Sequence, residues 1–218
     1  MTERFSEVLH REAQQIWEGI FSHPFLSEVQ AGKLPIDTFR YYVIQDYLYM
    51  EGYGRAVSIA LSKAPDTESI RQLARRINTP IERPLHKKMF DLLEIDEADV
   101  ARIGPSPTNR AYVNHMLTTA SMGGVGEAAA AILPCPWSYH EIGSRLLRPE
   151  HPVYEQWVDA YSSGLLEAST IAWRELVDRF GAEGGPAIRD SMRKAFLLSS
   201  RYEYMFWTMA YNQEQWPA

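Results

Sequence analysis

The sequence predicts an all-α protein, a single-domain helical bundle, on three observations. Apolar residues recur at helical spacing along most of the 218 residues. Runs that alternate apolar and polar residues and are rich in Val, Ile, Thr and aromatics, which mark strands, do not occur. Prolines and glycines separate the periodic segments and leave only short linkers. Because no repeat period or shift in composition divides the chain, we expect one domain over residues 1–218, built from about eight helices.

The first two predicted helices lie on either side of a turn. Residues 5–22 place apolar side chains on one helical face, and Pro24 ends this helix because the residue before a proline avoids helical backbone. A turn is predicted at residues 31–35, which contain glycine and proline. Residues 36–64 then form a long stretch without proline, and Pro65 ends it.

The middle of the chain combines helical periodicity with prolines. Residues 66–94 are helical in pattern, but Pro80 and Pro84 predict a break or kink, since a proline inside a helix costs about 3 kcal/mol. Residues 104–108 form a loop rich in glycine and proline, and Thr108 is the predicted N-cap of the helix that follows.

Glycine and proline also divide the C-terminal half. The predicted breaks are Gly123-Gly124, Pro134-Cys135-Pro136, residues 149–152 and residues 181–186. The longest helices predicted between and after them span residues 153–180 and 187–212.

Composition excludes several classes of protein. Hydrophobic residues make up 45% and charged residues 23% of the chain, which excludes bulk disorder, and a single cysteine excludes an internal disulfide framework. The 22 basic and 28 acidic residues give a net charge of −6, so nucleic acid is not an expected partner. Residues 1–12 lack the apolar segment of a signal peptide, and the apolar run 128–135 is far shorter than the ~20 residues that span a bilayer. We therefore expect a cytoplasmic protein without membrane contact.

Twelve tyrosines are many for an apolar core, and four positions explain part of the surplus. Tyr42, Asp46, Tyr49 and Tyr53 fall at i, i+4, i+7 and i+11 and so form one helical stripe. Three phenols around one carboxylate suit a polar pocket for a flat ring that carries amino groups. The alternative, an amphipathic helix whose tyrosines only pack, is equally compatible with the periodicity. Three more rings lie on other predicted helices: Tyr112, Tyr139 and Tyr161.

Cys135 is a candidate nucleophile because of its two neighbours. Pro134 is expected to end one helix and Pro136 to occupy the first position of the next. Cys135 would then lie at or near the helix N-cap, where unpaired N–H groups and the positive end of the dipole favour a thiolate. The alternative is a buried cysteine that fills space, and spacing alone does not decide between them.

Glu203 is a candidate general acid. Phe206 and Trp207 follow it at i+3 and i+4, on the same helical face. A carboxylate on an apolar face is costly unless it has a partner, and burial raises its pKa into the range of a general acid. The alternative is a core glutamate that is hydrogen-bonded by an arginine or a tyrosine. Pairing with an activated cysteine favours the interpretation of Glu203 as a general acid.

Metal and nucleotide sites have little support in the sequence. Glu82 and His86 are an i, i+4 pair, but no second such pair accompanies them, so a structural hydrogen-bonded pair is the better interpretation. Glycine-rich phosphate loops and the Gly-x-Ser-x-Gly elbow are absent. The glycines of residues 123–126 indicate close helix packing instead. We expect neither a metal nor a cofactor.

Together these motifs resemble the TenA/thiaminase-II family, which has a haem-oxygenase-like all-α fold. The resemblance covers nearly the whole chain and rests on residues 17–25, 39–49, 105–112, 133–137 and 199–211. It implies an aminopyrimidine aminohydrolase of thiamin salvage. Such enzymes convert 4-amino-5-aminomethyl-2-methylpyrimidine to the 5-hydroxymethyl compound and ammonia, and also cleave thiamin to hydroxymethylpyrimidine and thiazole. Cys135 places the chain with the cysteine-containing members.

The resemblance also implies roles for individual residues. Cys135 would add to C6 of the pyrimidine ring while Glu203 protonates N1, and Asp46 would bind the 4-amino group and N3. Tyr49, Tyr112 and Tyr161 match tyrosines near the ring or the catalytic groups, and Phe206 would form a wall of the ring site. With Tyr139 from the residue pattern, the expected substrate-binding residues are Asp46, Tyr49, Tyr112, Tyr139, Tyr161 and Phe206.

Three departures from the family pattern predict an altered or enlarged pocket. They are the two prolines of residues 79–84, Val125-Gly126, and the sequence after Tyr161 (residues 162–164). A hydrolase for a larger thiamin-derived pyrimidine is therefore one alternative. A non-catalytic pyrimidine-binding or regulatory protein is another, and a metal-dependent oxidase on the same fold is a third. Family members are commonly homotetramers, so we expect a homotetramer with a small-molecule pyrimidine as its ligand.

Overall fold

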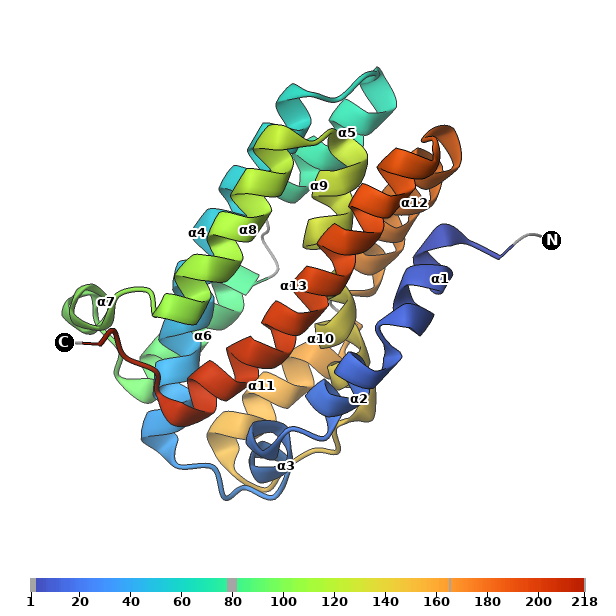
Figure 1. Ribbon diagram of the computed structural model, residues 1–218. Coiled ribbons are helices and arrows are strands. Elements are labelled where there is room, and N and C mark those ends of the chain that lie inside the picture. Colours follow the sequence, from blue (N-terminus) through green and yellow to red (C-terminus); the bar gives the residue numbers. More distant parts are fainter. Residues whose placement is uncertain (1–2, 78–81, 165, 218) are drawn as a thin grey trace.

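Two helices of 27 residues each, α4 (Ile36–Ser62) and α13 (Pro186–Asn212), run the length of the molecule (Figure 1). Between and beside them lie α8 (Pro107–Met122), α9 (Val125–Ile132) and α10 (Pro134–Arg145). The computed structural model describes residues 3–77, 82–164 and 166–217, and within these ranges it contains helices and no strand. The predicted all-α class is confirmed.

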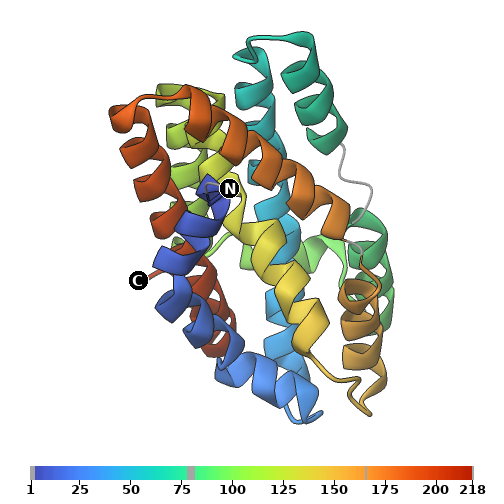
Figure 2. The same ribbon diagram turned by 90° about the vertical axis from the view of Figure 1, so that its right-hand side faces the viewer.

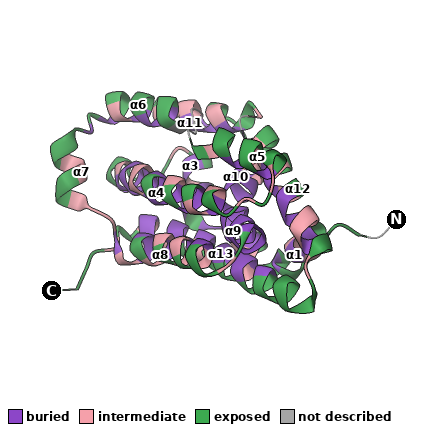
Figure 3. Ribbon diagram, turned by 90° about the horizontal axis from the view of Figure 1, so that it is seen from above, coloured by how far each residue is buried: buried purple, intermediate pink, exposed green. Residues whose placement is uncertain are grey.

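The remaining helices surround this centre. Helices α1 (Phe5–Glu12), α2 (Gln14–Phe21) and α3 (Pro24–Gln30), blue in Figure 2, run down one side and pack against α12 (Glu167–Glu183) and α13. Helices α6 (Glu82–Leu93) and α11 (Pro152–Ser162) form a row on the far side of α4 (Figure 3). Helices α5 (Thr67–Ile77) and α7 (Glu97–Ile103) complete the described part of the chain. No helix in the described ranges is both long and apolar enough to cross a membrane.

Several predicted boundaries are wrong, and each correction has a local cause. The stretch 5–22 is two helices that meet at Ala13, which is fully buried, so that α1 packs on α12 and α2 on α13. Helix α2 ends at Phe21, before Pro24, as predicted; Pro24 then starts the unpredicted helix α3, because proline suits the first helical position and His23 accepts the N–H of Phe25. The stretch 153–180 is divided between α11 and α12 near Gly164, whose φ of +78° favours glycine.

The start of α8 also differs from the prediction. Ser106, not Thr108, is its N-cap, and the Ser106 hydroxyl accepts the N–H of Asn109 at 3.1 Å. Thr108 instead donates its N–H and its hydroxyl to the carboxylate of Glu214, near the C-terminus, at 2.9 and 3.0 Å. Pro107 occupies the first helical position, so the helix starts two residues earlier than it would with Thr108 as its N-cap.

Within the stretch 66–94, α5 ends at Ile77 and α6 begins at Glu82. Pro80 lies outside the described residues. Pro84 lies in the first turn of α6, where the N–H that proline lacks would have no helical partner. Helix α7 was not predicted; a capping box between Asp96 and Asp99 starts it.

Helices α4 and α8 approach each other closely, and Gly52 makes this possible. A Cβ at Gly52 would lie 2.4 Å from Cγ1 of Val113, closer than atoms can pack. A Cβ at Gly126 would likewise lie 2.8 Å from Cβ of Phe180, which confirms the close packing predicted for residues 123–126. The first contact sets the distance between two helices that carry candidate site residues.

Candidate active site

Seven of the eight predicted site residues line one small cavity in the centre of the bundle. They come from four helices: Asp46 and Tyr49 from α4, Tyr112 from α8, Cys135 and Tyr139 from α10, and Glu203 and Phe206 from α13. Within each pair the spacing is i, i+3 or i+4, so both side chains leave the helix on the same face. The cavity is small, and all seven residues are at most 9% exposed.

The eighth residue, Tyr161, lies behind the cavity wall. It is on α11, and its ring packs against Tyr139 with 5.1 Å between ring centroids. The stripe on α4 also divides. Tyr42 lies behind the cavity, with its hydroxyl 3.1 Å from that of Tyr139, and Tyr53 accepts a hydrogen bond from Trp173. Only the two central members of the stripe, Asp46 and Tyr49, reach the cavity.

Cys135 is the second residue of α10, because this helix starts at Pro134 and not at Pro136 as predicted. Leu133 keeps helical backbone, so α9 continues almost directly into α10. Cys135 lies in the first turn of α10, and its side chain is 7% exposed. Because α9 runs almost directly into α10, the free helix N-terminus predicted at Cys135 is not present.

Glu203 is held by two hydroxyl groups. Tyr112 donates to Oε1 at 2.6 Å, and Ser138 donates to Oε2 at 3.3 Å. Burial raises the pKa of Glu203 to about 7, although both hydrogen bonds act in the opposite direction. An acid with this pKa is present in both protonation states near neutral pH, which suits a group that gives and regains a proton.

The two phenols beside Cys135 keep their protons. Burial is the main cause that raises the pKa of Tyr49 and of Tyr112 well above the ordinary value, and the neighbouring Cys135 and Glu203 contribute. Both rings can therefore act as hydrogen-bond donors at neutral pH. Tyr49 places its hydroxyl 3.3 Å from the sulfur of Met116, and Tyr112 uses its own on Glu203.

The carboxylate of Asp46 is held by His86, a histidine that the sequence analysis paired with Glu82. Nε2 of His86 lies 2.8 Å from Oδ2 of Asp46, and both side chains are buried. Nδ1 of His86 is buried without a hydrogen-bond partner among the described residues, so the contact of Nε2 with Asp46 is the hydrogen bond that holds the ring. The i, i+4 spacing had suggested Glu82 as the partner of His86; the side chain of Glu82 lies outside the described residues.

Sequence reasoning therefore missed two residues of the site, His86 and Ser138. Ser138 follows Cys135 at i+3, so its position on the face of the cysteine was available as a signal. His86 carried no such signal, because α4 and α6 come together only in the fold. Among the described residues, no three side chains of His, Cys, Asp or Glu are grouped closely enough to hold a metal ion.

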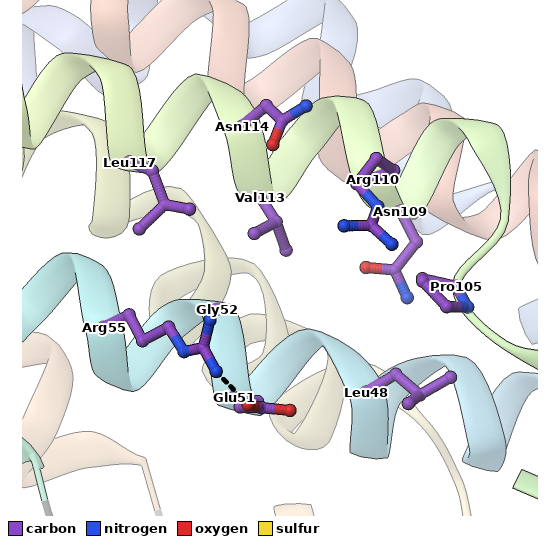
Figure 4. Close-up of a pocket in the computed structure, with 10 residues that line it drawn as sticks. All are labelled: Leu48, Glu51, Gly52, Arg55, Pro105, Asn109, Arg110, Val113, Asn114 and Leu117. Atoms are coloured by element: carbon purple, nitrogen blue, oxygen red, sulfur yellow. Dashed lines mark hydrogen bonds and ion pairs between the residues drawn. The ribbon is translucent and has the colours of Figure 1, made fainter. Parts of the chain in front are cut away.

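A larger hollow, of about 280 Å³, lies on the other side of the contact between α4 and α8 (Figure 4). An ion pair between Glu51 and Arg55 lies along its α4 wall, and Arg110 and Asn114 lie on its α8 wall. None of the predicted site residues lines it. The small inner cavity is thus the candidate active site.

The fold and this cavity define an all-α protein with a buried thiol, a carboxylic acid and a second carboxylate around a space for one small ring. The model of the TENA/THI-4/PQQC family matches residues 10–213. The chain is 36% identical over 217 residues to the aminopyrimidine aminohydrolase of Bacillus subtilis (strain 168), with 98% of this chain and 92% of the relative covered. It is 32% identical over 214 residues to the aminopyrimidine aminohydrolase of Helicobacter pylori, with 95% and 98% covered.

Solved structures agree. The TenA homologue protein from P. horikoshii OT3 superposes with a TM-score of 0.86 at 31% identity, with 96% of this chain and 99% of that chain covered. A structure described as a TenA family transcription regulator from Silicibacter sp. TM1040 has a TM-score of 0.86 at 26% identity, with 95% and 96% covered. This chain belongs to the TENA/THI-4/PQQC family.

Proposed function

We propose that this protein is an aminopyrimidine aminohydrolase in which Cys135 is the nucleophile and Glu203 the proton donor. The observation that carries the proposal is the presence of both groups in one buried cavity, with the carboxyl pKa at about 7. Four aromatic rings and the carboxylate of Asp46 line the cavity, and these groups suit a flat ring that carries an amino group. The relatives named aminopyrimidine aminohydrolase support the same reaction.

The reaction follows from the arrangement. The thiolate of Cys135 adds to C6 of 4-amino-5-aminomethyl-2-methylpyrimidine while Glu203 protonates N1 of the ring. The aminomethyl group, protonated as an ammonium, is then expelled as ammonia from the 5-methylene carbon by the electrons of the ring, and the water that adds afterwards releases one proton to the solvent. Water adds to the exocyclic methylene, N1 returns its proton and the thiolate leaves, which yields the 5-hydroxymethyl product. Covalent addition divides one difficult displacement into easier steps.

Asp46 recognises the amino group in this proposal. Oδ2 already accepts the hydrogen bond of His86, which leaves Oδ1 for the 4-amino N–H of the ring. Phe206 and Tyr139 form apolar walls for the ring, and the protonated Tyr49 lies beside the thiol. These contacts orient the ring so that C6 faces Cys135 and N1 faces Glu203.

Cleavage of thiamin is a second reaction that we propose for this site. The small cavity favours the aminomethylpyrimidine, which has one ring, over thiamin, which has two. Two of the departures that predicted an enlarged pocket lie elsewhere: Val125-Gly126 and residues 162–164 do not line the cavity, and the space at Gly126 is filled by Phe180. We therefore expect the aminomethylpyrimidine to be hydrolysed with a higher kcat/KM than thiamin.

The test is ammonia release from the aminomethylpyrimidine, run beside thiamin, for the wild type, Cys135→Ser and Glu203→Gln. We expect activity in the wild type and a loss of at least about 100-fold in each variant. Equal rates in the wild type and Cys135→Ser would rule out the covalent mechanism. The homotetramer and the cytoplasmic location stay predictions, and sedimentation velocity would check the first.

A regulatory protein is the second candidate, because one similar structure is described as a TenA family transcription regulator. Binding of the pyrimidine to the wild type without any ammonia release would favour this function. The paired Cys135 and Glu203 favour the enzyme, since binding alone requires neither.

A further inference from the structure

Ser138 contacts both residues that react in the proposed mechanism, Cys135 and Glu203. Its side chain is fully buried on α10. Its hydroxyl oxygen is 3.2 Å from the carbonyl oxygen of Cys135 and 3.3 Å from Oε2 of Glu203. A serine hydroxyl has one proton to donate and lone pairs with which to accept, so it cannot donate fully to both oxygens at once.

The charge state of Glu203 decides between these two acceptors. Tyr112, which keeps its proton, donates to Oε1 in either state. When Glu203 is protonated, its proton is therefore best placed on Oε2, where Ser138 can accept it while donating to the Cys135 carbonyl. When Glu203 is ionised, the Ser138 hydroxyl can turn and donate to Oε2.

We propose that Ser138 is a positioning residue whose hydroxyl turns between the Cys135 carbonyl and Oε2 of Glu203, and so pairs with the acid in both of its charge states. The inference rests on the proposed function in assigning Glu203 the role of proton donor. During that reaction Glu203 loses a proton to N1 of the ring and later regains it. A buried carboxyl without a partner in either state would slow one of the two transfers, because unpaired buried polar groups are costly.

Infrared difference spectroscopy of the protein without substrate tests the two hydrogen bonds directly. Spectra taken well below and well above neutral pH contain the C=O stretch of the protonated Glu203 and the stretches of its carboxylate, and Glu203→Gln assigns both by removing them. We expect Ser138→Ala to shift both sets of bands, because each charge state loses its partner. A shift of only one set, or of neither, would overturn the proposal.

The kinetic test uses a matched control on α12, whose hydroxyl hydrogen-bonds a backbone carbonyl of α10. Thr170 is also buried and donates its hydroxyl to the carbonyl of Pro136 at 3.1 Å, but it does not bond Glu203. Thr170→Val and Ser138→Ala should therefore lower the Tm by similar amounts. Only Ser138→Ala should lower kcat, by about ten-fold with little change in KM, the size expected for a hydrogen bond to a charged group.

Equal kcat values in these two variants would mean that Ser138 is only structural. Ser138→Thr keeps the hydroxyl and should restore most of the lost kcat; a variant as slow as Ser138→Ala would count against the proposal. The infrared measurement needs no turnover, so it tests the role of Ser138 separately from the proposed function. If the wild type released no ammonia, the proposed function would fail whatever the spectra showed; if ammonia release were normal and the bands did not shift, only the role of Ser138 would fail.

Discussion

At the scale of single residues, Glu203 shows how burial adapts an ordinary carboxyl group to acid chemistry. Its partners, Tyr112 and Ser138, bond one oxygen each, yet burial outweighs both and leaves the pKa at about 7. Because burial destabilises the ionised form, the carboxyl group still holds a proton near neutral pH and can donate it. The same property has a consequence for stability.

Because the pKa of Glu203 is raised in the folded state, the folded protein binds its proton more tightly than the unfolded chain does. This contribution to stability is complete below the unfolded pKa of 4.5 and is lost as the pH rises to about 7. Glu203→Gln cannot ionise, and its amide can accept from Tyr112 and donate to Ser138. We expect the variant to be inactive and, above pH ~7, more stable than the wild type by a few kcal/mol.

Urea denaturation at several pH values measures this difference, and it should vanish in acid. The activity of the wild type should fall as the pH rises through about 7, because the donor form of Glu203 disappears. A variant that is less stable than the wild type at all pH values would contradict this account.

His86 should affect binding of the ring through Asp46. In His86→Phe the carboxylate loses the bond to Oδ2, so its orientation toward the 4-amino group is no longer fixed. We expect about a ten-fold higher KM for the aminomethylpyrimidine, with a smaller change in kcat. Calorimetry with a ring that lacks the 4-amino group is the control: its affinity should not change, and an equal loss for both rings would indicate general damage to the pocket.

At the scale of helices, the distance between α4 and α8 depends on Gly52. In Gly52→Ala the new Cβ would collide with Val113, so the helices that carry Tyr49 and Tyr112 must separate. We expect a loss of about 1–3 kcal/mol in the free energy of unfolding and a lower kcat. Chemical denaturation and the ammonia assay measure the two effects.

Gly54→Ala is the matched control for this helix. Its Cβ would meet only the carbonyl oxygen of Ile77, at 3.9 Å, so the helix propensity of alanine should leave the protein as stable or more stable. Adding Val113→Ala to Gly52→Ala should recover part of the loss. If both glycine variants behaved alike, the close contact between α4 and α8 would not be the cause.

Helix boundaries illustrate what the sequence could and could not predict. The long proline-free helices α4 and α13 were predicted almost to the residue, because their periodicity is unbroken. The break at Ala13 was missed because it depends on burial against other helices, and the start of α8 was missed because Ser106, not Thr108, caps the helix, while Thr108 bonds the distant Glu214. In the site, Cys135 and Glu203 stood out by their local surroundings, whereas His86 became visible only through its contact with Asp46.

At the scale of the whole molecule, the site rests on a connected set of aromatic rings. Trp207 is fully buried and stacks on Tyr42 with 5.3 Å between centroids, and it also contacts Tyr139 and Trp157. These rings join α4, α10, α11 and α13 behind the cavity. Such continuous packing across the bundle fits one folding unit.

The prediction of one domain over residues 1–218 can be tested by unfolding. We expect urea to unfold the protein in one transition, with the same midpoint by far-UV circular dichroism and by tryptophan fluorescence. Two separate midpoints that persist as protein concentration changes would contradict a single domain, because dissociation of subunits depends on concentration.

The enclosed position of Cys135 has a consequence beyond catalysis. A thiolate strong enough to attack a pyrimidine is also open to oxidation by peroxide and to exchange with cellular disulfides. Here the sulfur lies behind tyrosine rings in a space too small for a bulky disulfide, so molecules reach it only if they are small enough to enter the cavity. If Cys135 is the nucleophile, as proposed, the walls that select the substrate also exclude bulky disulfides, whereas peroxide, which is smaller than the ring, can still enter.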